Sequence, residues 1–80
     1  MSFVYVVKPV LGQWEVGFGD NGSRFLYAGR DEAEQVARGA AQLHWETRNE
    51  PAGVRLELPG ERPSILAEFG PARRRHTPVP

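Results

Sequence analysis

The sequence predicts an α+β fold in which an antiparallel sheet of about five strands, in the order β-β-β-α-β-β, carries one helix on one face. Two observations predict it. Short segments that are rich in β-branched and aromatic residues or have apolar residues at every second position lie on both sides of one longer segment, whose apolar residues recur at helical spacing. Runs of strands around a single helix favour this class over a parallel α/β fold. We assign residues 1–70 to a single domain and residues 71–80 to a basic, proline-containing C-terminal tail.

Three segments before the helix predict a meander of antiparallel strands. Each is short and rich in aromatic or β-branched residues, and turn-forming residues separate them. In the second segment Trp14, Val16 and Phe18 occupy alternate positions, so they share one face and place Trp14 in the core. The expected strands are residues 3–8, 13–18 and 24–28.

The helix is expected over residues 31–47, and its start has two interpretations. Asp31 is the cap and Glu34 completes a capping box, or Gly29 is the cap and Glu32 supplies the acid. Under both, the acidic residues of the first turn favour the positive end of the helix dipole.

One narrow stripe of this helix is apolar and made mostly of small residues, which lets a helix lie close to a sheet. Gly39 stands in mid-helix, where we expect a close backbone contact. Trp45 lies on the flank of the stripe, either as a lid over the sheet edge or as part of a contact surface. The stripe consists of Ala33, Val36, Ala37, Ala40, Leu43, His44 and Thr47.

Two further strands, residues 54–58 and 64–69, follow the helix and alternate in the same way. We expect Arg55, Glu57 and Glu68 on the outer face. The positions expected to face the core are Val54, Leu56, Leu58, Ile65, Ala67 and Phe69.

Short motifs lie on three of these elements. They are Gly12-x-Trp14-x-Val16, Glu32-Ala33 continuing to Ala37, Ile65-x-x-Glu68 and Phe69-Gly70. With them, residues 3–70 resemble the small bacterial family catalogued as domain of unknown function 2188. The chain departs from the family at Gly29, where a Ser, Thr or Asp cap is usual, at Glu34, where an aliphatic residue is usual, and in the proline-rich loop 59–63. The resemblance implies a fold, and it implies no activity and no functional residues.

Size and composition bound the class of protein. The chain has 80 residues, enough for one domain, and no cysteine, which excludes disulfides and thiol nucleophiles. Its longest apolar stretch, residues 3–7, is far shorter than the roughly 20 residues of a membrane-spanning helix. The N-terminus lacks the pattern of a signal peptide. We therefore expect a cytoplasmic protein without a membrane partner.

No group of residues predicts catalysis, a cofactor or a metal site. His44 lies on the inner stripe of the helix and is expected to be a histidine at the edge of the core, without further ligands near it in the sequence. No serine stands in a nucleophile elbow. The run Gly17–Gly22 has the spacing of a dinucleotide-binding loop but precedes a strand, so it is a turn. We expect no enzyme activity.

Three carboxylates on the outer face could form an acid/base pair, and the competing interpretation is ordinary ion pairing across strands. They are Glu15, Glu57 and Glu68, with Arg24 and Arg55 as the expected basic partners. Ion pairing is favoured because a small open sheet offers no depth for a pocket that shifts pKa values.

These patterns predict a small interaction module that acts through protein–protein contacts, either as a homo-oligomer or with another protein. The candidate surface comprises Trp45, Arg55 and Glu57, and the expected dimer contacts are an edge strand or the Trp45 flank.

The alternative is a nucleic-acid accessory protein. Residues 1–70 carry a net charge of −3, and the tail carries +3 from Arg73, Arg74 and Arg75, which are candidate phosphate contacts. Binding that weakens steeply with salt and disappears when residues 71–80 are removed would separate this alternative from the interaction module.

Overall fold

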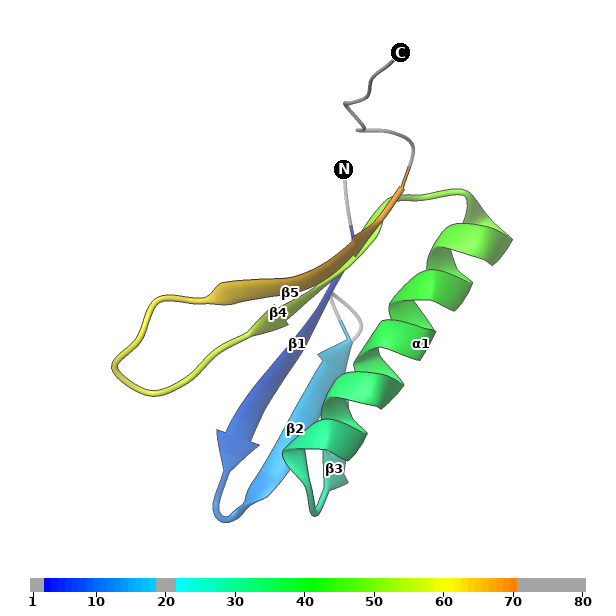
Figure 1. The fold of residues 1–80 in the computed structure, drawn as a ribbon. Helices are drawn as coiled ribbons and strands as arrows, with labels where there is room; N and C mark the ends of the chain where they lie inside the picture. The colour runs from blue at the N-terminus through cyan, green and yellow to red at the C-terminus, as the bar shows by residue number, and fades with distance from the viewer. Residues whose placement is uncertain (1–2, 19–21, 71–80) are drawn as a thin grey trace.

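A computed structural model describes residues 3–18 and 22–70, and within them it confirms the α+β class (Figure 1). One helix lies against one face of a five-stranded sheet. The elements in chain order are β1 (Phe3–Val10), β2 (Gln13–Phe18), β3 (Ser23–Tyr27), α1 (Arg30–Arg48), β4 (Ala52–Leu56) and β5 (Ser64–Phe69).

The sheet is mixed, and in this respect the prediction of an antiparallel sheet was wrong. The strand order is β3-β2-β1-β4-β5, and the central pair β1 and β4 runs parallel, whereas the other three ladders are antiparallel. The cause lies in the crossover. Strand β3 runs in the same direction as β1, and the helix carries the chain back along the sheet, so β4 starts at the end where β1 starts.

A two-residue turn joins β1 to β2 and fixes their register. Leu11 and Gly12 have φ angles of 49° and 81°, the pair of positive values that defines a type I′ hairpin turn. Because Val10 opposes Gln13 across this turn, β1 extends past its expected end at residue 8. Pro9 is tolerated within the strand because the ladder with β4 ends at the pair Val7 and Leu56. No strand residue beside Pro9 therefore requires the N–H that proline lacks.

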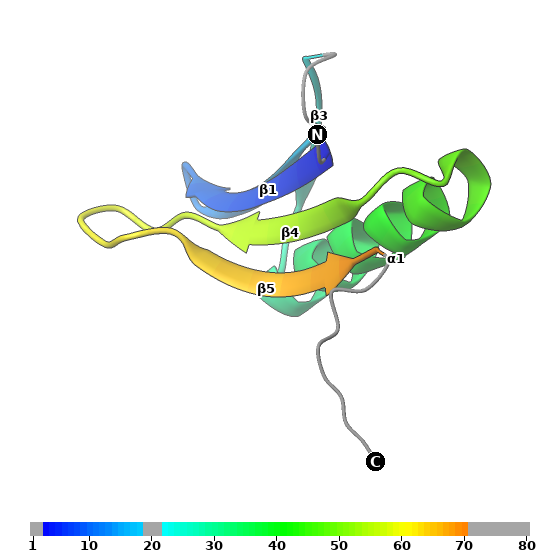
Figure 2. The same cartoon turned by 90° about the horizontal axis from the view of Figure 1, so that it is seen from above.

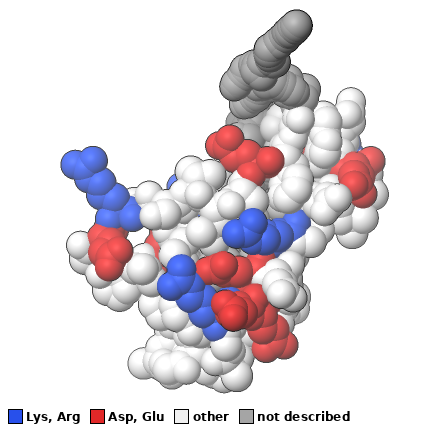
Figure 3. Space-filling view, viewed as in Figure 1, with Lys and Arg blue, Asp and Glu red and all other residues white. Residues whose placement is uncertain are grey.

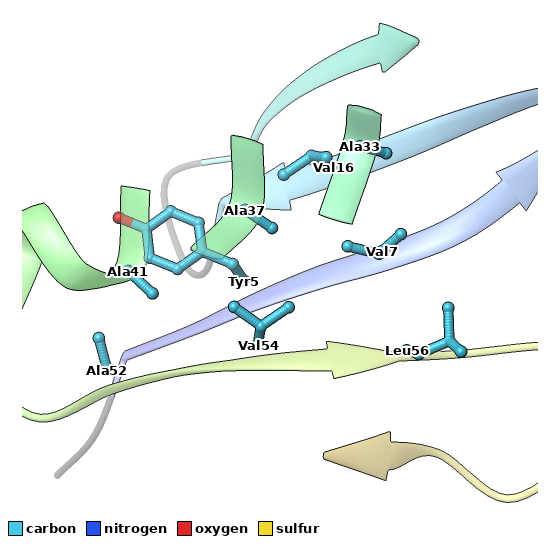
Figure 4. Close-up of a cluster of buried hydrophobic side chains, with 9 residues drawn as sticks. All are labelled: Tyr5, Val7, Val16, Ala33, Ala37, Ala41, Ala52, Val54 and Leu56. Atoms are coloured by element: carbon cyan, nitrogen blue, oxygen red, sulfur yellow. The ribbon is translucent and has the colours of Figure 1, made fainter. Parts of the chain in front are cut away.

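The helix packs on the sheet through alanines. Ala33, Ala37 and Ala41 are each 0% exposed, and Figure 4 shows them facing the side chains of the central strands. The sequence identified Ala33 and Ala37 but missed Ala41, and it placed Leu43 and Thr47 on the buried stripe, which was wrong because both are exposed. The contact follows the i, i+4 row of alanines, which turns the buried face toward residue 41 and away from residue 43.

The helix begins without a capping box. Gly29 is the N-cap, as one of the two interpretations had it, but within the described residues no side chain caps the helix. Glu34 instead accepts a hydrogen bond of 2.7 Å from Arg30 one turn earlier. At the other end Asn49 adopts the left-handed conformation, and its N–H donates to the carbonyl of Trp45.

The centre of the core is formed by β-branched side chains from three neighbouring strands: Val7, Val16 and Val54. Tyr5 is 5% exposed and fills the space between these strands and the helix (Figure 4). Trp14, expected in the core, is only half-buried, and it packs on the outside of this cluster with the Arg30 guanidinium 5.8 Å from its ring centre.

A bulge in β5 explains an incorrect assignment. The register passes from Val54 opposite Ala67 to Arg55 opposite Ile65, so Leu66 is an extra residue. The strand therefore changes face at this point. Ile65, expected in the core, is 61% exposed, and Leu66 packs against the core in its place.

Gly39 provides a test of how the helix meets the solvent. The expected close contact is absent, because a Cβ built at Gly39 has no neighbouring atom within 4 Å among the described residues outside its own helix turns. Gly39→Ala should therefore raise the free energy of unfolding by about 0.5–1 kcal/mol, since alanine loses less backbone entropy on folding. Chemical denaturation of both proteins measures the difference, and a loss of stability would show that something covers this side of the helix.

Candidate interaction surface

The sheet face opposite the helix carries no other element of the described chain, as the view from above shows (Figure 2). Its side chains form rows across the strands. One row runs from Arg24 through Gly17, Val6 and Arg55 to Ile65. A second row joins Leu26, Glu15 and Lys8. Apolar and charged positions alternate along this open face, and no aromatic side chain stands on the positions named.

Ion pairs across and along the strands neutralise much of its charge. Glu15 lies 3.8 Å from Lys8 and 3.7 Å from Arg24, and Arg55 lies 2.8 Å from Glu57. The expected pairing of Glu15 with Arg24 across strands is thereby confirmed, whereas Glu57 pairs with Arg55 of its own segment and not across strands. Arg55 also keeps one polar atom, Nε, that is buried and has no hydrogen-bond partner among the described residues.

The space-filling view shows basic and acidic side chains next to one another on the face presented in Figure 1 (Figure 3). Such a mixed surface does not provide the continuous basic stripe with which proteins bind nucleic-acid backbones. The arginines proposed to contact phosphates, Arg73, Arg74 and Arg75, lie outside the described residues.

The three residues proposed as an interaction surface do not come together. Trp45 is on the helix and half-buried, whereas Arg55 and Glu57 belong to the opposite side of the sheet. The parity of β4 explains this placement, because its neighbours Val54 and Leu56 point into the core beneath the helix.

A different apolar pair is exposed at the β3 edge. Phe25 is 50% exposed and Leu26 is 53% exposed, and they occupy opposite faces of the same short strand. Phe25 faces the helix side, but the helix packs mainly over β1, β2 and β4, so half of the Phe25 surface stays exposed. The sequence assigned Phe25 to one side of a strand and gave no sign that β3 is an edge, because strand order depends on the crossover.

A row of rings connects this edge to the interior. Phe25 lies edge-on to Phe18 at 5.3 Å, Phe18 to Tyr5 at 4.9 Å, and Tyr5 to Phe3 at 5.1 Å. His44 stacks on Phe3 at 4.4 Å. Since each ring is held by its neighbours, Phe25 is positioned on a rigid aromatic base although half of its own surface is exposed.

The two edges of the sheet differ in how they are protected. Strand β5 has a bulge at Leu66 and follows directly on Pro63, both devices that hinder pairing with a further strand. Strand β3 pairs with β2 in regular register along its whole length, without proline or bulge. The β3 edge is therefore the one better suited to accept another strand.

The hairpin register shows which backbone groups β3 offers. In a two-residue hairpin the closing pair, Val10 and Gln13, is hydrogen-bonded, so the odd-numbered residues of β2 bond to β1. The even-numbered residues of β2 then face β3, where they oppose Ser23, Phe25 and Tyr27. The N–H and C=O groups of Arg24 and Leu26 consequently point away from the sheet at its free edge.

One expectation about a single residue, His44, can now be compared with the structure. His44 lies at the edge of the core, as expected, and its Nε2 is 3.0 Å from a carboxylate oxygen of Glu50. The pKa of the neighbouring Tyr5 is raised, because burial of its hydroxyl outweighs the opposite effect of the nearby Arg48 charge. Over residues 3–18 and 22–70, no three His, Asp or Glu side chains gather as metal ligands would.

The helix α1 of the described residues lacks the combination of length and apolar character needed to cross a membrane. Comparison with family models, with curated proteins and with solved structures gives no match to this chain.

Proposed function

We propose that the protein is a small protein–protein interaction module that binds a partner strand at the free edge of β3. The observation that carries the proposal is that one strand presents both exposed apolar side chains and outward-pointing backbone groups. Phe25 and Leu26 present apolar surface on both faces, and Arg24 and Leu26 present the backbone donors and acceptors. Strand addition uses these two elements together: main-chain hydrogen bonds and pockets for alternate side chains.

The rest of the molecule supports this choice of surface. The opposite edge is hindered by its bulge, and the open face is largely occupied by ion pairs among Lys8, Glu15, Arg24, Arg55 and Glu57. A partner that covered the open face would have to desolvate these charges, at a cost in free energy. A strand added beside β3 leaves most of them in water.

Site-specific photo-crosslinking in the native cell tests the proposal. A photoreactive amino acid replaces Leu26 in one variant and Leu43 in a control, because Leu43 is exposed to a similar extent, 58%, but lies on the helix. We expect several-fold more crosslinked protein from position 26. Excess unlabelled chain should suppress these crosslinks, and excess chain with Leu26→Pro should not, because proline removes the outward N–H.

Equal crosslinking from positions 26 and 43 would contradict the proposal. So would equal competition by the unlabelled chain and by its Leu26→Pro variant. A far-ultraviolet circular dichroism spectrum checks that the Leu26→Pro chain remains folded; if it does not, Leu26→Lys serves as the competitor, because it keeps the backbone donor but places a charge where a partner side chain would pack.

A further inference from the structure

We infer that the strand accepted at this edge is β3 of a second copy of the chain, running antiparallel, with Phe25 on the two-fold axis. The inference rests on the proposed function and names its partner. A two-fold pair is isologous, so each residue of one β3 must be compatible with its symmetry-related position in the other. This requirement limits the possible registers to a few, which can be compared residue by residue.

Within β3, only Arg24 and Leu26 point their backbone groups outward, so they must form the hydrogen-bonded pairs. When Phe25 lies on the axis, Arg24 opposes Leu26 of the second copy and Leu26 opposes its Arg24. The two residues of each pair exchange two hydrogen bonds, so the outward N–H and C=O groups of Arg24 and Leu26 are all bonded.

The two neighbouring registers are poorer. Placing Arg24 on the axis sets two guanidinium groups directly opposite one another, which destabilises a cross-strand pair. Placing Leu26 on the axis sets Arg24 opposite Ala28, which lies beyond the end of β3 at Tyr27. The register centred on Phe25 avoids both faults.

The side chains fit this register on each face. On the helix side the two Phe25 rings form a close, non-hydrogen-bonded cross-strand pair, each supported from behind by Phe18. On the open side the apolar stem of Arg24 covers Leu26 of the other copy, while its guanidinium stays near Glu15 of its own chain at 3.7 Å. The zero net charge of the chain adds no long-range repulsion between copies.

The absence of cysteine from the sequence permits a direct test of geometry. In this register the Cα atoms of residue 25 in the two copies are about 4.5 Å apart, within the range of a disulfide. Purified chain with Phe25→Cys should therefore form a disulfide dimer under mild oxidation much faster than chain with Leu43→Cys, which has a comparably exposed position on the helix.

A mixture of two variants tests the register itself. Chains with Arg24→Cys and chains with Leu26→Cys, mixed in equal amounts, should form the mixed disulfide in preference to either symmetric one, because only positions 24 and 26 oppose each other. Preference for a symmetric disulfide would overturn the register centred on Phe25.

Light scattering of the purified full chain measures the association without any crosslink. We expect a dimer at high concentration. In Leu26→Lys the dissociation constant should rise at least tenfold, which corresponds to a loss of about 1.4 kcal/mol of binding free energy, and in Leu43→Lys it should not change. A chain that stays monomeric up to about 1 mM, together with disulfides that form no faster at position 25 than at position 43, would overturn self-pairing. Crosslinks to other proteins from position 26 would then leave the proposed function standing, whereas their absence would remove both.

Discussion

Tyr5→Ala is expected to lower the free energy of unfolding by about 3–5 kcal/mol, the range for truncating a large aromatic side chain in a core. Tyr5 is 5% exposed and contacts the rings of Phe3, Phe18 and His44. Its removal leaves a cavity between sheet and helix at the middle of the aromatic row. A domain of this size holds about 5 kcal/mol in total, so much of the chain would be unfolded at 25 °C.

Urea denaturation followed by tryptophan fluorescence measures the change, with Tyr5→Phe as the matched control. Phenylalanine keeps the ring and its contacts, so the control should stay close to the parent protein. Trp14→Ala should cost less than Tyr5→Ala although it removes a larger side chain, because Trp14 is only half-buried. A greater loss from Trp14→Ala would place the centre of the core nearer to the β2–β3 end of the sheet.

Ala37→Leu is expected to destabilise the fold by about 1–3 kcal/mol through overpacking. Ala37 is the middle member of the alanine row and is fully buried against the sheet, so a longer side chain must push the helix away or adopt a strained rotamer. Helix propensity cannot account for such a loss, because leucine is nearly as good a helix former as alanine.

The adjacent variant Arg38→Leu is the control for this experiment. Residue 38 is exposed on the same helix, so the same leucine is added there without a packing conflict. We expect its free energy of unfolding to stay within about 0.5 kcal/mol of the parent value. If both variants unfold at the same denaturant concentration as the parent, the helix does not lie as close to the sheet as the alanine row indicates.

Local patterns in the sequence were sufficient to predict the elements but not their arrangement. Alternation, or in the first strand a run of β-branched and aromatic residues, located all five strands within a few residues, and the spacing of Ala33 and Ala37 located the helix and part of its buried face. The parallel pairing of β1 with β4 was missed because alternation describes one strand at a time and contains no information about the neighbour that a crossover provides.

Two features of the candidate site were hidden for related reasons. The bulge at Leu66 moves Ile65 to the opposite face, and a single inserted residue leaves no separate sign in a strand of six residues. The exposure of Phe25 follows from the position of β3 at the edge and from the path of the helix. Neither can be deduced from the residues around Phe25, which alternate like those of a covered strand.

The parallel ladder at the centre of the sheet also has a consequence for biosynthesis. Strands β1, β2 and β3 are contiguous in the chain and can pair as soon as they are made, but Phe3 finds its neighbour Ala52 only after the helix has been synthesised. Contacts between such distant residues slow folding, because a long loop must close first. Until then the inner edge of the three-stranded unit is uncovered, so a released chain truncated near residue 50 should bind chaperones or aggregate where the finished chain does not.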